Sequence, residues 1–141
     1  MNTAKPVWTI DPKLEEDSHP VASFELCDVR LMDDANYPWL VLVPRVAEAV
    51  ELIDLDAAQR HALTDEIDRA SRVLREVFRP DKLNVAALGN LVPQLHVHVI
   101  ARYRDDPAWP RPVWGTATAL HYSEEALIDR VGQLQTALRA L

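Results

Sequence analysis

Two histidines stand two residues apart in the stretch PQLHVHVIAR, which runs from Pro93 to Arg102. Gln94 precedes His96 by two residues, just as His98 follows it by two. An imidazole with its ordinary pKa of about 6.5 is mostly neutral at pH 7, and it can then act as a nucleophile or bind a metal. Successive side chains of a strand alternate between its faces, so a strand here would place Gln94, His96 and His98 on one face.

This arrangement favours nucleophilic chemistry at phosphorus. The central imidazole, His96, would attack, provided that an acceptor holds its other ring nitrogen. The flanking Gln94 and His98 could donate hydrogen bonds to the phosphoryl oxygens as charge develops there. The break just before the strand contains Gly89 and Asn90, whose backbone N–H groups can also point at an anion.

Two other interpretations compete with this one. The polar residues could form the solvated face of an amphipathic strand, although such faces more often carry Thr, Lys, Glu or Arg. A His-x-His pair could also bind a metal, but a metal site needs three or four ligands. The remaining candidate ligands show no metal-site spacing; they are Cys27, His19, His61 and His121. We therefore expect neither a metal ligand nor a cofactor.

The composition narrows the class of protein. The 141 residues are 48% hydrophobic, which is typical of one globular domain. The net charge of −7 argues against binding of long nucleic acids, whose affinity depends on Lys and Arg. A single cysteine excludes an internal disulfide, and the chain has neither a signal-peptide pattern nor an apolar run long enough for a membrane span. We expect a soluble cytoplasmic protein.

Hydrophobic periodicity predicts the elements. Residues 24–32 alternate as a strand, residues 33–38 have turn composition, and the apolar run 39–43 is a second strand of a hairpin. A helix is predicted between 54 and 78, with Asp56 and Gln59 as a capping box and Asp54 as an alternative cap. Its apolar face consists of Leu63, Ile67, Ala70, Leu74 and Val77.

Strands at 82–88 and 94–102 follow, then a proline-rich loop and a last helix capped by Ser123. The apolar positions of this helix are Leu127, Val131, Leu134 and Leu138. Residues 1–20 hold three prolines and many charges, so an irregular arm or short capping segment is expected. Hairpins on both sides of one long helix indicate an α+β fold with an antiparallel sheet rather than a βαβ repeat.

Several of these segments together resemble one family. QLHVHVI is similar to the histidine triad (HIT) motif, with Gln94 at the position of the first histidine. PWLVLVPR resembles a strand end of the same family, with Trp39 where relatives often have His, and GNLVPQLHVHV resembles its phosphate-binding run, with Asn90 in place of Gln. The resemblance covers residues 22–102.

The resemblance implies a single HIT-like domain over 1–141, with a sheet of about five strands, a 1–20 arm and a 103–141 C-terminal loop and helix. His96 would form a covalent nucleotidyl intermediate that water hydrolyses to a nucleoside monophosphate. His98 would bind the phosphoryl oxygens. The substrate-binding residues implied are Asn90, Gly89, Asn84, Asp33 for the ribose, and Leu31 and Leu26 for the base; for Asp33 and Asn84 an ordinary structural role is also open.

Gln94 is the departure from the family pattern. An amide donates and accepts hydrogen bonds but cannot carry a proton as imidazolium does. If leaving-group protonation depends on this position, substrates with good leaving groups, such as polyphosphates, should be favoured. The expected activity is hydrolysis of dinucleoside polyphosphates or nucleoside phosphoramidates by a homodimer. The alternatives are a nucleotide-binding regulatory module without turnover and a metal-binding His-x-His domain.

Overall fold

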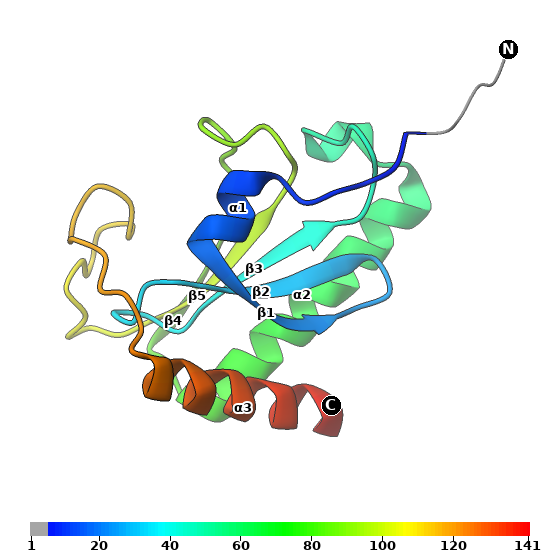
Figure 1. The fold of residues 1–141 in the computed structure, drawn as a ribbon. Helices are drawn as coiled ribbons and strands as arrows, with labels where there is room; N and C mark the ends of the chain where they lie inside the picture. The colour runs from blue at the N-terminus through cyan, green and yellow to red at the C-terminus, as the bar shows by residue number, and fades with distance from the viewer. Residues whose placement is uncertain (1–5) are drawn as a thin grey trace, which may run out of the picture.

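The computed structural model describes residues 6–141 and contains one five-stranded antiparallel sheet (Figure 1). The strands follow the order β1-β2-β3-β5-β4. Their bounds are Ser18–Ser23 for β1, Cys27–Met32 for β2, Trp39–Pro44 for β3, Lys82–Ala86 for β4 and Val97–Arg102 for β5. The α+β class and the antiparallel sheet predicted from the sequence are confirmed.

The two long helices lie together on one side of the sheet. Helix α2 (Ala57–Phe78) begins at the predicted capping box, in which Asp56 and Gln59 each accept a hydrogen bond from the other's backbone N–H. Asp54 instead ends a short 3-10 turn, η1 (Leu52–Asp54). Helix α3 (Glu124–Ala140) begins at Ser123, whose hydroxyl accepts from the Ala126 amide.

The core between the sheet and the helices follows the predicted periodicities. Leu63, Ala70 and Leu74 of α2 are buried, and Ile67 and Val77 pack partly buried beside them. Strand residues with the matching alternation complete this core: Cys27, Val29, Leu31, Leu40, Leu42, Val97 and Val99. Burial of apolar surface at about 25 cal/mol per Å² is the main stabilising contribution of this layer.

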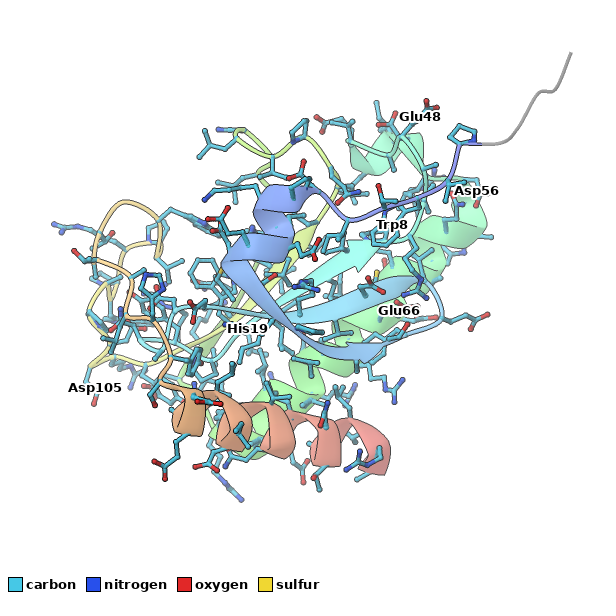
Figure 2. The ribbon with its side chains drawn as sticks, in the orientation of Figure 1. Trp8, His19, Glu48, Asp56, Glu66 and Asp105 are labelled. Atoms are coloured by element: carbon cyan, nitrogen blue, oxygen red, sulfur yellow. The ribbon has the colours of Figure 1, made fainter. Side chains whose placement is uncertain are left out.

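One residue of the α2 inner face is charged. Glu66 is only 9% exposed, and its two carboxylate oxygens accept hydrogen bonds from the backbone amides of Leu26 and Cys27 at 2.9 and 2.8 Å. Figure 2 shows Glu66 under the end of the hairpin that joins β1 and β2. A helix side chain thus satisfies two backbone donors that the sheet leaves unpaired.

The N-terminal region is more regular than the irregular arm or short capping segment expected for residues 1–20. Residues 12–17 form helix α1 (Pro12–Asp17), with Asp11 as its N-cap, and β1 pairs with β2 as the fifth strand of the sheet. The capping geometry of Asp11 and Pro12 is a local signal, whereas β1 is stabilised by pairing with a distant segment. The first five residues of the expected arm lie outside the described residues.

The opposite face of the sheet is covered by α1 and by the loop of residues 103–122. Its buried cluster contains Leu14 from α1, Tyr37, Trp39, Val41, Val43 and Ile100 from the sheet side, and Ala108 and Val113 from the loop. Both histidines lie on this side, since His98 pairs with Val41 across the sheet. Within residues 6–141, no helix has the length and apolar character needed to cross a membrane.

Candidate active site

The backbone around the two histidines is extended but only partly in the sheet. β5 begins at Val97, three residues later than predicted, so His98 lies within the strand and His96 immediately before it. His96 is 7% exposed and His98 4%. Their ring centroids are 4.9 Å apart with the planes at 77°, so the start of β5 brings the two imidazoles into contact.

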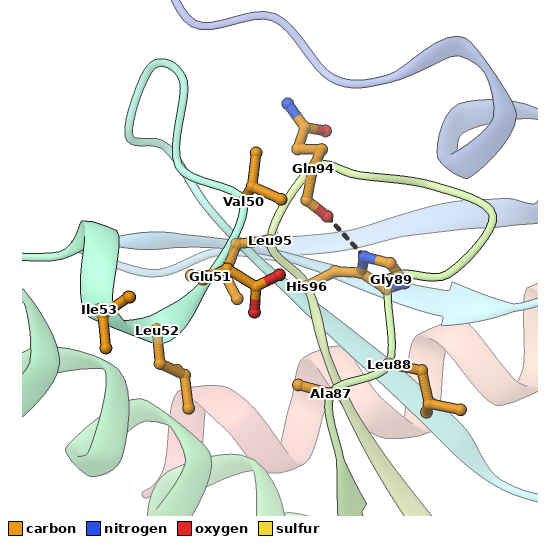
Figure 3. Close-up of a pocket in the computed structure, with 10 residues that line it drawn as sticks. All are labelled: Val50, Glu51, Leu52, Ile53, Ala87, Leu88, Gly89, Gln94, Leu95 and His96. Atoms are coloured by element: carbon orange, nitrogen blue, oxygen red, sulfur yellow. Dashed lines mark hydrogen bonds between the residues drawn. The ribbon is translucent and has the colours of Figure 1, made fainter.

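Each histidine is held by one ring nitrogen. His96 Nδ1 lies 2.7 Å from the backbone oxygen of Gln94, as Figure 3 shows. A carbonyl oxygen only accepts, so His96 Nδ1 carries the proton and its Nε2 keeps a free lone pair. His98 Nδ1 accepts a hydrogen bond of 2.9 Å from the indole Nε1 of Trp39. The proton of neutral His98 therefore lies on Nε2.

The two rings thus have complementary outer nitrogens. Among residues 6–141, no hydrogen bond engages Nε2 of either ring. Burial, together with the neighbouring His96, lowers the pKa of His98 from 6.5 to about 3, so this ring is neutral at pH 7. One ring offers a lone pair to an electrophile, and the other offers an N–H donor to an oxyanion.

The side chain of Gln94 turns away from the histidines. Its Oε1 accepts from the Asp11 amide at 2.8 Å and its Nε2 donates to the Thr9 carbonyl at 2.8 Å. Figure 3 shows the amide pointing from the pocket toward the N-terminal segment. The amide is thus bonded to two backbone groups of that segment, and only the Gln94 carbonyl is directed at His96.

A pocket of about 370 Å³ adjoins His96 (Figure 3). Its walls come from the segment after β3 and from the loop between β4 and β5; they are Val50, Glu51, Leu52, Ile53, Ala87, Leu88, Gly89, Gln94, Leu95 and His96. Glu51 is the single charged residue among them. Figure 3 shows its carboxylate turned toward the His96 side of the pocket.

The loop between β4 and β5 contains the two residues expected to bind phosphate. Gly89 lines the pocket with φ of +73°, and a Cβ there would lie 3.3 Å from the Val92 carbonyl, so this turn requires glycine. Asn90 is exposed in the same loop, and no hydrogen bond in the described part of the chain engages its side chain. The structure therefore brings Gly89, but not the Asn90 side chain, to His96.

Asn84 has a structural partner. It lies on β4 opposite Ile100, and its Oδ1 accepts from Arg102 at 2.8 Å. Arg102 is 1% exposed and also forms an ion pair of 2.8 Å with Asp106, which ties the start of the 103–122 loop to the sheet. The amide of Asn84 thus contributes to this buried network, in line with the structural alternative noted above.

Asp33 is held by the segment that leads into α3. Its carboxylate accepts from the Tyr122 amide at 3.0 Å and lies 2.8 Å from His121 Nδ1 and 3.3 Å from His19 Nε2. Burial raises its pKa, but these hydrogen bonds outweigh burial and hold it below the ordinary value. Asp33 lines a second pocket with Met32, Trp39 and Val113, yet both of its oxygens already have partners.

The two leucines expected to wall a base pocket lie on the wrong side of the sheet for that role. Leu31 is fully buried in the core under α2, and Leu26 packs against the same core. Leu31 pairs with Leu40, whereas His98 pairs with Val41, so strand alternation puts Leu31 and His98 on opposite faces. The expectation for Leu31 and Leu26 is therefore wrong.

Two tryptophans cover the histidine pair. Trp39 and His98 have ring centroids 5.5 Å apart, and Trp114 from the 103–122 loop lies 5.0 Å from His98 and 5.6 Å from Trp39, all edge to face. The loop thus closes over the site of its own chain. The other tryptophan of this loop, Trp109, packs against Arg102, whose guanidinium carbon lies 5.7 Å from the centre of the Trp109 ring. The sequence singles out Trp39 only because it stands where relatives often have His. Its hydrogen bond to His98 could not be predicted from the sequence.

The described residues contain no group of three or more His, Cys, Asp or Glu side chains that could hold a metal ion. His96 and His98 have no such partner beside them in that part of the chain. Glu51 lines the pocket beside His96, and a second pocket, on the Trp39 side, has Asp33 and Asp34 among its charged residues. The described residues at this centre thus supply two imidazoles, of which His98 is neutral at pH 7 because its pKa is lowered to about 3.

Comparison with known proteins agrees with this geometry. A histidine triad protein from Bradyrhizobium japonicum superposes with a TM-score of 0.92 at 49% identity, covering 94% of this chain and 99% of that one. A histidine triad protein from Marinobacter aquaeolei VT8 superposes with a TM-score of 0.92 at 44% sequence identity, and the match covers 96% of this chain and 98% of that one.

A curated relative from Mycobacterium tuberculosis, AP-4-A phosphorylase, is 39% identical over 82 residues. The match spans 50% of this chain but only 40% of that relative's length. The family model for the HIT domain matches residues 13–105, which include both histidines, Gln94 and the whole sheet. The chain belongs to the HIT-domain family.

Proposed function

We propose that this protein is a nucleotide hydrolase that acts at the α-phosphorus of dinucleoside polyphosphates or nucleoside phosphoramidates. The observation that carries the proposal is the hydrogen bond between His96 Nδ1 and the Gln94 carbonyl, because in the neutral ring it places the proton on Nδ1 and leaves the Nε2 lone pair free. The membership of the HIT family and the similarity to AP-4-A phosphorylase support a nucleotide-processing role.

The reaction has two steps. The lone pair of His96 Nε2 attacks phosphorus, the bond to the leaving group breaks, and the leaving group departs with that electron pair. The resulting nucleotidyl-imidazolium keeps its Nδ1 proton. The Gln94 carbonyl accepts this hydrogen bond and so stabilises the positive charge of the ring. Water then attacks phosphorus and loses a proton to solvent, the P–Nε2 bond breaks, and His96 returns to its neutral form with a nucleoside monophosphate released.

His98 serves both steps as a hydrogen-bond donor. Its Nε2–H would contact a non-bridging phosphoryl oxygen, on which negative charge increases in each transition state. The Gly89 turn lies beside His96 in the same pocket, where its backbone can approach the phosphate closely. Since the Gln94 amide is bonded to Thr9 and Asp11, a polyphosphate departs as the anion, whereas the amine of a phosphoramidate takes its proton from water as the P–N bond breaks.

The proposal is tested by incubating the protein separately with diadenosine tetraphosphate and an adenosine phosphoramidate and measuring AMP. A rapid quench followed by mass spectrometry should find an adduct of about 329 Da on His96, the mass of the expected nucleotidyl group. His96→Ala should lose turnover and adduct, whereas His61→Ala, which alters an exposed histidine of α2, should retain both. Turnover by His96→Ala at the wild-type rate would exclude this mechanism.

Two further measurements separate the alternatives. A regulatory module would bind the nucleotides, by calorimetry, without AMP release from either wild type or His96→Ala. A metal-binding domain would contain stoichiometric metal when purified without a His tag.

We further propose that the protein is a homodimer joined through β4. β4 forms one edge of the sheet, and apolar side chains remain exposed on it and on the following loop, with Val85 51%, Leu88 48% and Leu91 94% exposed. Light scattering should give twice the chain mass, and Val85→Glu should shift the mass toward the monomer, whereas Val7→Glu, distant from β4 in the chain, should not. A monomeric wild type would refute the dimer.

A further inference from the structure

Trp39 reaches His98 because of the register between β3 and β5. Val41 pairs with His98 and Trp39 with Ile100, so Trp39 and His98 are diagonal neighbours on one face of the sheet. The indole Nε1 of Trp39 lies 2.9 Å from His98 Nδ1. Both residues are buried, with Trp39 6% exposed and His98 4% exposed. Water has little access to replace this bond.

The chemistry of the partner decides which tautomer His98 adopts. An indole has one N–H and no acceptor, so it can only donate. His98 Nδ1 must then be unprotonated, which leaves the single proton of the neutral ring on Nε2. A histidine at position 39 would leave this open, since a neutral imidazole can donate through one nitrogen or accept through the other.

Neighbouring rings hold Trp39 in this orientation. Trp114 contacts it edge to face at 5.6 Å, and Tyr37 does so at 6.3 Å. Trp39 packs in the same cluster as Val41, Val43 and Ile100, so a rotation of the indole would disturb a buried layer. The donor is thus positioned before any substrate arrives, which is the condition for efficient electrostatic stabilisation.

We propose that Trp39 is a positioning residue that fixes His98 as the Nε2–H tautomer, so that His98 presents a neutral hydrogen-bond donor to the phosphoryl oxygen. The inference rests on the proposed function, in which His98 contacts that oxygen. Together with the Gln94 carbonyl, which sets the opposite tautomer on His96, Trp39 divides two chemically identical side chains into a nucleophile and a donor.

The test begins with the tautomer, which is measured without substrate. Long-range proton–nitrogen correlation spectra of protein labelled with ¹⁵N in its histidines distinguish Nε2–H from Nδ1–H. Wild-type His98 should be Nε2–H. Trp39→Phe keeps an aromatic ring but removes the donor, so His98 should become a mixture of tautomers. Trp109→Phe makes the same change to an indole that packs against Arg102, and it should retain Nε2–H.

Kinetics then connect the tautomer to the reaction. With an adenosine phosphoramidate as substrate, Trp39→Phe should lower kcat by about tenfold with little change in KM, because the donor acts mainly on the transition state. Trp109→Phe should keep kcat within about twofold of the wild type, since it leaves the hydrogen bond from Trp39 to His98 in place.

The outcomes separate this inference from the proposed function. Wild-type His98 observed as Nδ1–H would overturn the role of Trp39 even if Trp39→Phe failed to fold. Retention of pure Nε2–H and full kcat in a folded Trp39→Phe would also overturn it. A wild type with the Nε2–H tautomer but no AMP release would refute the hydrolase and, with it, the catalytic purpose of the tautomer.

Discussion

The N-terminal segment should loosen when the Gln94 amide is removed. Gln94→Ala deletes both hydrogen bonds to this segment, one to the Asp11 amide and one to the Thr9 carbonyl. Each such bond contributes about 0.5–1.5 kcal/mol net. Because Gln94 is partly exposed, we expect a loss of about 1–2 kcal/mol in total.

The consequence is measurable at one amide. Hydrogen exchange of the Asp11 amide should accelerate by about 5- to 30-fold in Gln94→Ala, the factor that corresponds to about 1–2 kcal/mol. The Cys27 amide, which is bonded to Glu66 on the other side of the sheet, should exchange as in the wild type. Gln133→Ala, an exposed glutamine of α3, is the matched control and should change neither amide.

Two further substitutions at this position refine the result. Gln94→Glu keeps an acceptor for Asp11 but sets a carboxylate against the Thr9 carbonyl, so it should lose part of the protection. Gln94→His restores the histidine of the family motif, but the two nitrogens of an imidazole point apart and cannot bond both backbone groups side by side. Gln94→His should therefore loosen the segment as Gln94→Ala does. Unchanged exchange of the Asp11 amide in Gln94→Ala would refute the reasoning.

Three other predictions concern stability, pH and substrate choice. Glu66→Gln should lower the free energy of unfolding by about 1–3 kcal/mol in urea titrations, because the charged acceptor of two backbone amides is lost, whereas exposed Asp65→Asn should change it by less than about 0.5 kcal/mol. The pKa of His98 is about 3 in the folded protein against 6.5 as its ordinary value, so the unfolded state binds more protons between these pH values. Stability should therefore fall as pH drops below 6.5, by up to about 1.4 kcal/mol per unit from this group, and His98→Asn should flatten that slope; a slope unchanged in the variant would contradict the assignment. Glu51→Gln should raise kcat/KM for diadenosine tetraphosphate by about two- to threefold relative to an adenosine phosphoramidate. The reason is that it removes a negative charge, beside His96, that repels the negatively charged polyphosphate. An unchanged ratio would place the polyphosphate elsewhere.

Local patterns in the sequence were sufficient for the elements that carry their own signals. The capping box of Asp56 and Gln59, the helical spacing of Leu63, Ala70 and Leu74, and the Ser123 cap all appear as predicted. Each of these signals acts between residues that are at most a few turns apart. The hairpin of β2 and β3 is predictable for the same reason.

The elements that were missed depend on distant partners. β1 holds Pro20 and a disturbed pairing register, and its pairing with β2 makes it a strand. Alternation along the 94–102 segment predicted that Gln94 would share a face with the histidines. The strand begins only at Val97, and two backbone groups more than 80 residues away along the chain direct the Gln94 side chain.

The sequence by itself determined that the protein has a two-histidine centre next to a glycine turn, on an antiparallel sheet covered by one long helix. Residue type and spacing carry that information, because strand alternation and helical period are properties of the backbone. Tertiary structure alone decided what each polar group does. Leu31 faces the wrong side, Asp33 holds the segment before α3, and Trp39 and the Gln94 carbonyl give His98 and His96 opposite tautomers. The hydrogen bond from Trp39 to His98 joins groups 59 residues apart and leaves no local pattern in the sequence, so only the tertiary structure shows that the two rings differ.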